Sequence, residues 1–176
     1  MEVYDGILDK DTLLSIYNPM VNSHMWSLSR TSERGTRNEQ GCGFPCYPLK
    51  RHDVFYDVFL KTLEDVRAEH FERTGSKWTG DYLHRIDIVA KQPHVKTNLH
   101  YDVSPEDDPN KEAYSIIGMI TPEWDNSWGG EFCTEKDTVP YEPGRFIVIK
   151  STEKHNGYSP NQITPYWRLV VNYITK

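Results

Sequence analysis

Hydrophobic residues recur along the chain with two different periods, and the change comes near residue 80. Between residues 52 and 74 apolar side chains return every three or four positions among charged ones, a pattern typical of an amphipathic helix packed on a sheet. Gly75 is a natural stop for this helix. A shorter repeat after Asp9 and Asp11, either of which would cap it, predicts an earlier helix that Pro19 ends.

After residue 80 the pattern becomes that of strands. The Pro143-Gly144 pair has the residues that a type II turn favours at its two central positions. Short strands with turns between them, preceded by helices, predict a mainly β fold: a small barrel or sandwich buttressed by the 52–74 helix. The strands are expected at 85–89, 95–103, 114–121, 146–149 and 167–174.

The segment from residue 29 to 50 fits neither pattern. It is polar and rich in glycine, which predicts a loop of roughly 20 residues. Such a loop is either a lid over a functional site or a flexible insertion. Cys42 and Cys46 lie in it, but no second cysteine pair completes a zinc site, so ordinary loop cysteines are the favoured interpretation.

Composition narrows the class of protein. A chain of 176 residues with 37% hydrophobic and 26% charged residues predicts one globular domain spanning 1–176. It has no apolar run of about 18 residues and no secretory signal, so we expect no membrane association. Its three cysteines suggest reduced thiols in a cytoplasmic protein. A net charge of -6 argues against a nucleic acid partner.

The candidate chemistry begins with two histidines and a carboxylate. On a strand, His100 and Asp102 point to the same face, because side chains alternate. His155 follows a predicted buried strand and is expected at a strand edge. Two imidazoles and one carboxylate leave about three positions of an octahedral metal open, the arrangement found in non-haem Fe(II) oxygenases.

Arg168 is the fourth candidate, because it stands inside the apolar strand expected at 167–174. A buried guanidinium is costly and requires a partner. The partner is either an internal carboxylate, such as Asp87 or Glu131, or the carboxylate of a bound ligand.

Several sequence pieces occur in a fixed order from Asn98 to Tyr173, and together they resemble the Fe(II)/2-oxoglutarate-dependent dioxygenases. Within that superfamily they resemble the prolyl 4-hydroxylase-like branch. The resemblance covers most of the chain from about residue 80. The pieces are His100-Tyr101-Asp102, Ile120-Thr121-Pro122-Glu123-Trp124, Trp128-Gly129-Gly130-Glu131-Phe132, Pro143-Gly144-Arg145-Phe146, His155 and Arg168.

The resemblance implies a double-stranded β-helix, or jelly-roll, core over about 81–176, supported by helices in about 1–80. His100, Asp102 and His155 would bind Fe(II), and Arg168 would bind the far carboxylate of the co-substrate 2-oxoglutarate. With O2, and with ascorbate in support, such an enzyme makes succinate and CO2 while it hydroxylates a substrate C–H bond. The implied substrate is a small molecule or peptide, with a peptidyl or free prolyl residue the suggestion of this branch.

The sequence also departs from the family. Two tyrosines and a serine that many members place around the co-substrate are replaced near Ala90, Met119 and Val170. Arg168 then holds the co-substrate with fewer contacts, or another tyrosine substitutes. The candidates are Tyr114, Tyr166 and Tyr173.

Two other classes of protein remain as alternatives. A catalytically silent jelly-roll binding module would be expected to lack at least one ligand, whereas all three and the arginine are present. A cupin-type metalloenzyme usually relies on more histidines and no buried arginine. His52 and His70 are expected on the surface or face of their helix, without a site role.

Overall fold

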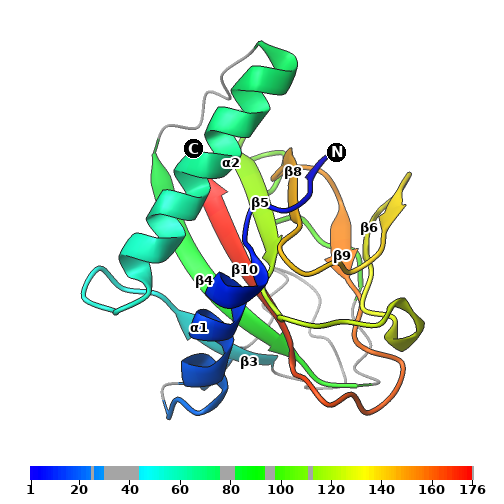
Figure 1. The fold of residues 1–176 in the computed structure, drawn as a ribbon. Coiled ribbons are helices and arrows are strands. Elements are labelled where there is room, and N and C mark those ends of the chain that lie inside the picture. The colour runs from blue at the N-terminus through cyan, green and yellow to red at the C-terminus, as the bar shows by residue number, and fades with distance from the viewer. Residues whose placement is uncertain (25, 30–43, 76–81, 94–97, 111–112, 176) are drawn as a thin grey trace.

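Two antiparallel sheets dominate the fold (Figure 1). The computed structural model describes residues 1–24, 26–29, 44–75, 82–93, 98–110 and 113–175. Within these, the major sheet has the order β1 (Glu2–Tyr4), β8 (Phe146–Lys150), β5 (Tyr114–Met119), β10 (Arg168–Thr175), β4 (Leu83–Lys91), β3 (Phe44–Pro48) and β2 (Ser27–Ser29). The minor sheet has the order β7 (Thr138–Val139), β6 (Phe132–Thr134) and β9 (His155–Gly157). The mainly β, jelly-roll fold expected from the sequence is confirmed, and residues before 80 add three strands to the major sheet.

Two helices lie against the face of the major sheet that is turned away from the minor sheet (Figure 1). They are α1 (Lys10–Val21) and α2 (Tyr56–Thr74). The Asp9 side chain caps α1 by accepting from the Thr12 N–H, and Gly75 ends α2 in the left-handed conformation, as predicted. Neither described helix is both long and apolar enough to cross a lipid bilayer.

The predicted end of α1 at Pro19 is wrong. The helix continues to Val21, because a proline in the last turn removes only one backbone hydrogen bond and the turn is held in other ways. Met20 is buried, and its carbonyl oxygen accepts from the Trp26 indole N–H at 2.8 Å.

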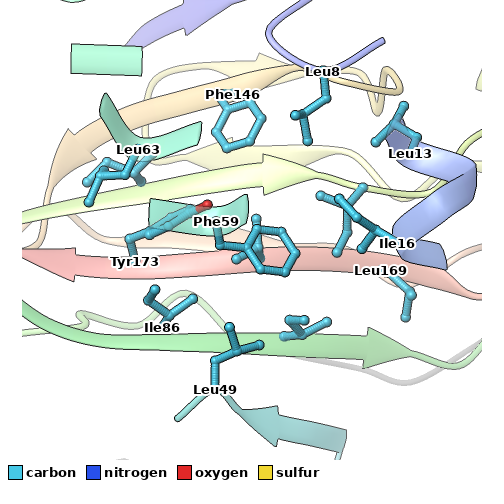
Figure 2. Close-up of a cluster of buried hydrophobic side chains, with 14 of the residues drawn as sticks. Leu8, Leu13, Ile16, Leu49, Phe59, Leu63, Ile86, Phe146, Leu169 and Tyr173 are labelled. Carbon is cyan, nitrogen blue, oxygen red and sulfur yellow. The ribbon is translucent and has the colours of Figure 1, made fainter. Parts of the chain in front are cut away.

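The main core fills the space between the major sheet and the helices (Figure 2). Alternate residues of each strand supply it, which follows from the two-residue period of a strand. On β10, Leu169, Val171 and Tyr173 point to this side. Phe59 and Leu63 meet them from α2, as Leu13 and Ile16 do from α1.

His70 was expected at the surface or on the face of its helix, and the surface alternative is wrong. Its side chain is buried, and Nδ1 lies 2.7 Å from both the Tyr4 hydroxyl and Glu2 Oε2. It therefore joins β1 to α2. The helical period alone does not show that the first strand of the chain covers this end of α2.

The opposite face of the major sheet turns toward the minor sheet and carries a second, smaller core. Its buried members are Ile117, Met119, Phe132, Val139, Tyr141, Ile147, Ile149 and Val170. Arg168 precedes Val170 by two positions on β10, so it shares this inner face. The apolar inner face thus becomes polar at one end.

Two further expectations are corrected. No strand is formed by the described residues 98–103, where one was expected over 95–103; His100 makes only an isolated bridge to His155. The loop predicted over 29–50 gives way at its end to β3, because Tyr47 and Leu49 are buried in the core and β4 offers an edge to pair with. The rest of that loop, including Cys42 and the lid proposed for it, lies outside the described residues, while Cys46 is a free cysteine of β3.

The Pro143-Gly144 turn is formed as predicted. Gly144 has a φ of +78°, and the Arg145 N–H donates to the Glu142 carbonyl oxygen at 3.1 Å. A Cβ atom at Gly144 would collide with the carbonyl oxygen of Leu8. The turn therefore requires glycine for both its conformation and its close contact with the N-terminal segment.

We expect Gly144→Ala to lower the free energy of unfolding by about 2 to 3 kcal/mol, because strain and a backbone collision combine. Gly75→Ala is the matched control: its φ is +67°, but a Cβ there meets open space, so only about 1 kcal/mol is expected. Urea unfolding of both variants measures the difference. Equal destabilisation would show that the contact with Leu8 is unimportant.

Candidate metal centre

The three predicted ligands converge. His100, Asp102 and His155 each offer a ligand atom, and these atoms lie within 4.8 Å of one another. His155 Nε2 is 3.4 Å from Asp102 Oδ2, and His100 Nε2 is 3.8 Å from Asp102 Oδ1. In the part of the chain that the structure describes, no other such group of histidine, cysteine and carboxylate side chains is present.

Backbone pairing brings these residues together without a regular strand. His100 and His155 exchange two backbone hydrogen bonds, of 2.9 and 3.0 Å. The Asp102 and Val103 N–H groups then both donate to the Ser151 carbonyl oxygen at 3.1 Å. The segment with the first two ligands is thereby held against the segment that leads into β9.

Both imidazoles are oriented through their Nδ1 atoms. His155 Nδ1 lies 2.9 Å from the Glu153 carbonyl oxygen, and His100 Nδ1 lies 3.3 Å from that of Asn98. A carbonyl oxygen can only accept, so each Nδ1 carries the proton in these contacts. Each Nε2 is then the nitrogen turned toward Asp102, and in its unprotonated form it can bind a metal, an arrangement common in metalloproteins.

The carboxylate is oriented by serine. The Ser115 hydroxyl on β5 donates to Asp102 Oδ2 at 2.5 Å, and it lies 2.9 Å from the Ser151 hydroxyl. Ser115 is buried on the inner face of the major sheet. This pair of hydroxyl groups was not identified from the sequence, because nothing in its spacing relates residue 115 to residue 102.

The charges within the group are coupled. Burial by itself would raise the pKa of Asp102, but the hydrogen bond and charge of His155, helped by Ser115, lower it to about 2. Burial opposes protonation of His155, yet its contact with Asp102 raises its pKa. Burial and the neighbouring His155 lower the pKa of His100. The carboxylate is therefore ionised and His100 is neutral at pH 7, as metal ligation requires.

The three side chains of the group differ in their exposure to solvent. His155 is 4% exposed, while the side chains of Asp102 and His100 are 14% and 39% exposed. Solvent, or a substrate, therefore reaches the group from the side of His100.

Arg168 lies on the inner face and is 1% exposed. Its Nε donates to the Gly130 carbonyl oxygen at 2.8 Å, and its Cζ lies 5.0 Å from the centre of the Tyr141 ring. Among the described residues Nη1 has no hydrogen-bond partner. Burial lowers the pKa of Arg168 to about 10, so the guanidinium remains charged at neutral pH.

The internal carboxylates considered as partners do not pair with Arg168. Asp87 pairs with Arg85 at 2.9 Å instead. Glu131 makes no ion pair with Arg168 within 4 Å, although its charge favours the cation from further away. An unsatisfied buried nitrogen is costly in a folded protein, and a ligand carboxylate would satisfy it.

Glycine lets the backbone approach this guanidinium closely at two positions. A Cβ atom at Gly130, where φ is +87°, would lie 3.0 Å from Arg168 Nε. A Cβ atom at Gly157 would lie 3.0 Å from Arg168 Nη2. Any larger residue at either position would press on the guanidinium.

The tyrosines suggested as substitutes lie elsewhere. Tyr173 is buried on the helix side of the sheet, Tyr166 bonds to Glu123 at 3.1 Å, and the Tyr114 ring lies beneath Lys150. The residues that do surround Arg168 are Tyr141 and Lys91, which sequence reasoning missed. Strand pairing places Lys91 there, and hydrogen bonds to Thr121 and to the Leu169 carbonyl oxygen hold Tyr141; the sequence carried no signal for either.

No family model matches the sequence, and no curated protein matches it. Solved structures do match. A prolyl-4-hydroxylase from Pseudomonas putida has a TM-score of 0.70 and 14% identity, over 99% of this chain and 91% of that one.

Two more structural neighbours have the same fold. The viral collagen prolyl hydroxylase from Paramecium Bursaria Chlorella virus-1, in a 2-oxoglutarate complex, has a TM-score of 0.61 and 14% identity, over 99% of this chain and 94% of that one. The non-haem alpha-ketoglutarate-dependent epimerase SnoN from nogalamycin biosynthesis has a TM-score of 0.62 and 14% identity, over 99% and 76%. The resemblance noted in the sequence is thus confirmed at the level of the fold.

We expect His100→Ala and Asp102→Ala each to abolish stoichiometric Fe(II) binding, because either leaves only two ligands. His84→Ala, an exposed histidine of β4, should bind iron like the wild type. Iron content after anaerobic equilibrium dialysis is the measurement. One iron per chain retained in either ligand variant would contradict the assignment.

Ser115→Ala should weaken metal binding by about 10- to 100-fold, the usual effect of removing a group that orients a ligand. Ser15→Ala, on the exposed side of α1, is the control and should have no effect. Competition with a chromogenic chelator gives both dissociation constants. An unchanged constant for Ser115→Ala would mean that Asp102 needs no support from β5.

Proposed function

We propose that this protein is a non-haem Fe(II) dioxygenase that couples the oxidative decarboxylation of 2-oxoglutarate to the hydroxylation of a substrate C–H bond. The observation that carries the proposal is the combination of a two-histidine, one-carboxylate group with a buried arginine that has an unsatisfied nitrogen. A metal group alone fits many enzymes, and a buried arginine alone fits many folds. Together they supply the two sites that the proposed reaction needs, an open metal group and a cation for the co-substrate carboxylate.

The residues fit the proposed metal. His100, Asp102 and His155 would hold Fe(II) through two nitrogens and one oxygen, leaving other coordination positions open. Bound there with O2, Fe(II) would supply the oxidation of 2-oxoglutarate to succinate and CO2 and the transfer of an oxygen atom to the substrate. Ascorbate would act as a supporting reductant.

The residues also fit the proposed co-substrate. Gly157 contacts Arg168 and lies two positions after His155 on β9, a separation of about 7 Å along a strand. A short dicarboxylate can span that distance, with its keto acid end at the metal and its far carboxylate at Arg168. Arg168 would bind and orient the co-substrate with charge-assisted hydrogen bonds.

The substrate is proposed to be a peptide or a small molecule, and a peptidyl or free prolyl residue is the specific candidate. Two of the structural neighbours carry the name prolyl hydroxylase, which supports that candidate. One neighbour with the same fold is an epimerase, so the substrate and the type of reaction follow from the site and not from the fold. The net charge of -6 disfavours nucleic acid, and we place the protein in the cytoplasm, away from membranes.

The two alternative functions, a silent binding module and a cupin-type metalloenzyme, account for fewer features of the site. A silent binding module gives no reason for three ligands with oriented imidazoles and an ionised carboxylate. A cupin-type metalloenzyme gives no reason for a buried guanidinium with an unsatisfied nitrogen.

We expect the purified protein with Fe(II), ascorbate and 2-oxoglutarate to form succinate, and Arg168→Met to lower that turnover at least about 100-fold, because a buried charge-assisted contact is lost. Arg85→Met, an exposed arginine of β4, is the control and should keep full turnover. Chromatography of the succinate formed measures turnover in the wild type and in both variants. No succinate from the wild type, together with no binding of 2-oxoglutarate, would refute the proposed function.

The substrate class is then found by incubating the active enzyme with proline-containing peptides, free amino acids and small metabolites. Mass spectrometry should reveal a product heavier by one oxygen atom. Its formation should require 2-oxoglutarate and be absent with Asp102→Ala.

A further inference from the structure

Two basic residues face each other across neighbouring strands at the polar end of the inner face. Arg168 is the register partner of Lys91 where β10 pairs with β4. Directly opposite residues of an antiparallel pair point to the same side, with Cβ atoms about 5 Å apart. Ala90, near which the family's tyrosine was expected, faces the helices, whereas its neighbour Lys91 faces the site.

Both basic groups contact the same residue of the minor sheet. Lys91 Nζ donates to the Gly157 carbonyl oxygen and lies 3.4 Å from Asn156 Oδ1. Arg168 Nη2 also lies close to Gly157, where a Cβ atom would come within 3.0 Å of it. The two cations thus lie next to the same glycine, two positions along β9 from His155.

This arrangement is unfavourable without an anion. Like charges directly opposite each other on paired strands destabilise a sheet, and burial adds to that cost. Burial and the charge of Arg168 lower the pKa of Lys91 to about 7. Arg168 itself makes no ion pair with any described carboxylate within 4 Å and keeps an unsatisfied Nη1. A negative group placed between the two side chains would relieve both defects.

We propose that Lys91 is a second binding residue for the far carboxylate of 2-oxoglutarate, which it contacts from β4 while Arg168 contacts it from β10. This inference rests on the proposed function. Lys91 takes the place of the hydroxyl contacts that the sequence lacks near Ala90 and Val170. The carboxylate is held by two cations, so the site strongly favours a 2-oxo acid with a second carboxylate over one without.

The test is calorimetric titration of the Mn(II)-loaded protein with 2-oxoglutarate and with 2-oxobutyrate, which lacks the far carboxylate. Lys91→Met should weaken 2-oxoglutarate binding by about 10- to 100-fold and leave 2-oxobutyrate binding unchanged. Lys91→Arg, which keeps a cation, should bind 2-oxoglutarate within a few-fold of the wild type. Lys61→Met, on the exposed side of α2, is the control.

A second readout uses only the wild type and Lys91→Arg. Because Lys91 titrates near pH 7, an anion that raises its pKa should draw in a proton, so 2-oxoglutarate binding at pH 7.5 should show proton uptake. Binding heats in two buffers of different ionisation enthalpy measure this uptake, and Lys91→Arg should show none. Among the described residues, the charged or titratable groups that act on Lys91 include Arg168 on β10, Cys133 on β6 and His100, all unchanged in both proteins, with His100 held by the metal.

The outcomes separate the two proposals. If the wild type binds 2-oxoglutarate but Lys91→Met binds it equally well, or loses both 2-oxo acids alike, the role of Lys91 is refuted and the proposed function stands. If Lys91→Met does not fold, absence of proton uptake in the wild type refutes that role instead. If the wild type does not bind 2-oxoglutarate at all, both proposals fail.

Discussion

The buried guanidinium of Arg168 is the constraint around which the rest of the site is arranged. It is 1% exposed, and among the described residues its one hydrogen bond is to the Gly130 carbonyl oxygen. Every element that it contacts therefore has to accommodate it. Glycine is required where β6 and β9 approach it, and the ring of Tyr141 covers it. Burial of an unpaired charge destabilises the folded protein, and a ligand carboxylate that pairs with Arg168 would offset this cost.

Because side chains alternate along each strand, the major sheet has one face that packs in the core and one face that carries residues of the candidate site. One face of β10 and β4 packs against α1 and α2 in a continuous apolar core. The other face is apolar in its middle, with Arg168 and Lys91 at one end of the β10–β4 pair and Ser115 on β5, opposite the other end of β10. Neighbouring residues of one strand therefore have different roles: Leu169 packs in the main core, while Arg168 belongs to the candidate site. A one-residue shift of register would exchange these faces, so the core enforces the geometry of the site.

The metal centre depends on a different kind of contact. Its three ligands are held by a short backbone bridge and by carbonyl and hydroxyl groups that orient each ring and carboxylate. The carboxylate is ionised through its contact with His155, and His100 is kept neutral by burial. The site then has a negative charge at Asp102, beside the metal group, and positive charges at Arg168 and Lys91. This distribution of charge suits a ligand with a chelating end and a distant carboxylate.

Local information in the sequence determined the helices, most strands of the β region, the Pro143-Gly144 turn and the four residues of the candidate site, because periodicity, glycine and residue chemistry are local properties. Tertiary structure alone decided that helix α1 passes Pro19, that His70 is buried beneath β1, that β3 joins the sheet, and that His100 is placed by a bridge and not by a strand. It also decided that Lys91 and Ser115 face the site. The physical reason is that burial, register and pairing are set by contacts between segments far apart in the chain, and no local pattern encodes which segments will meet.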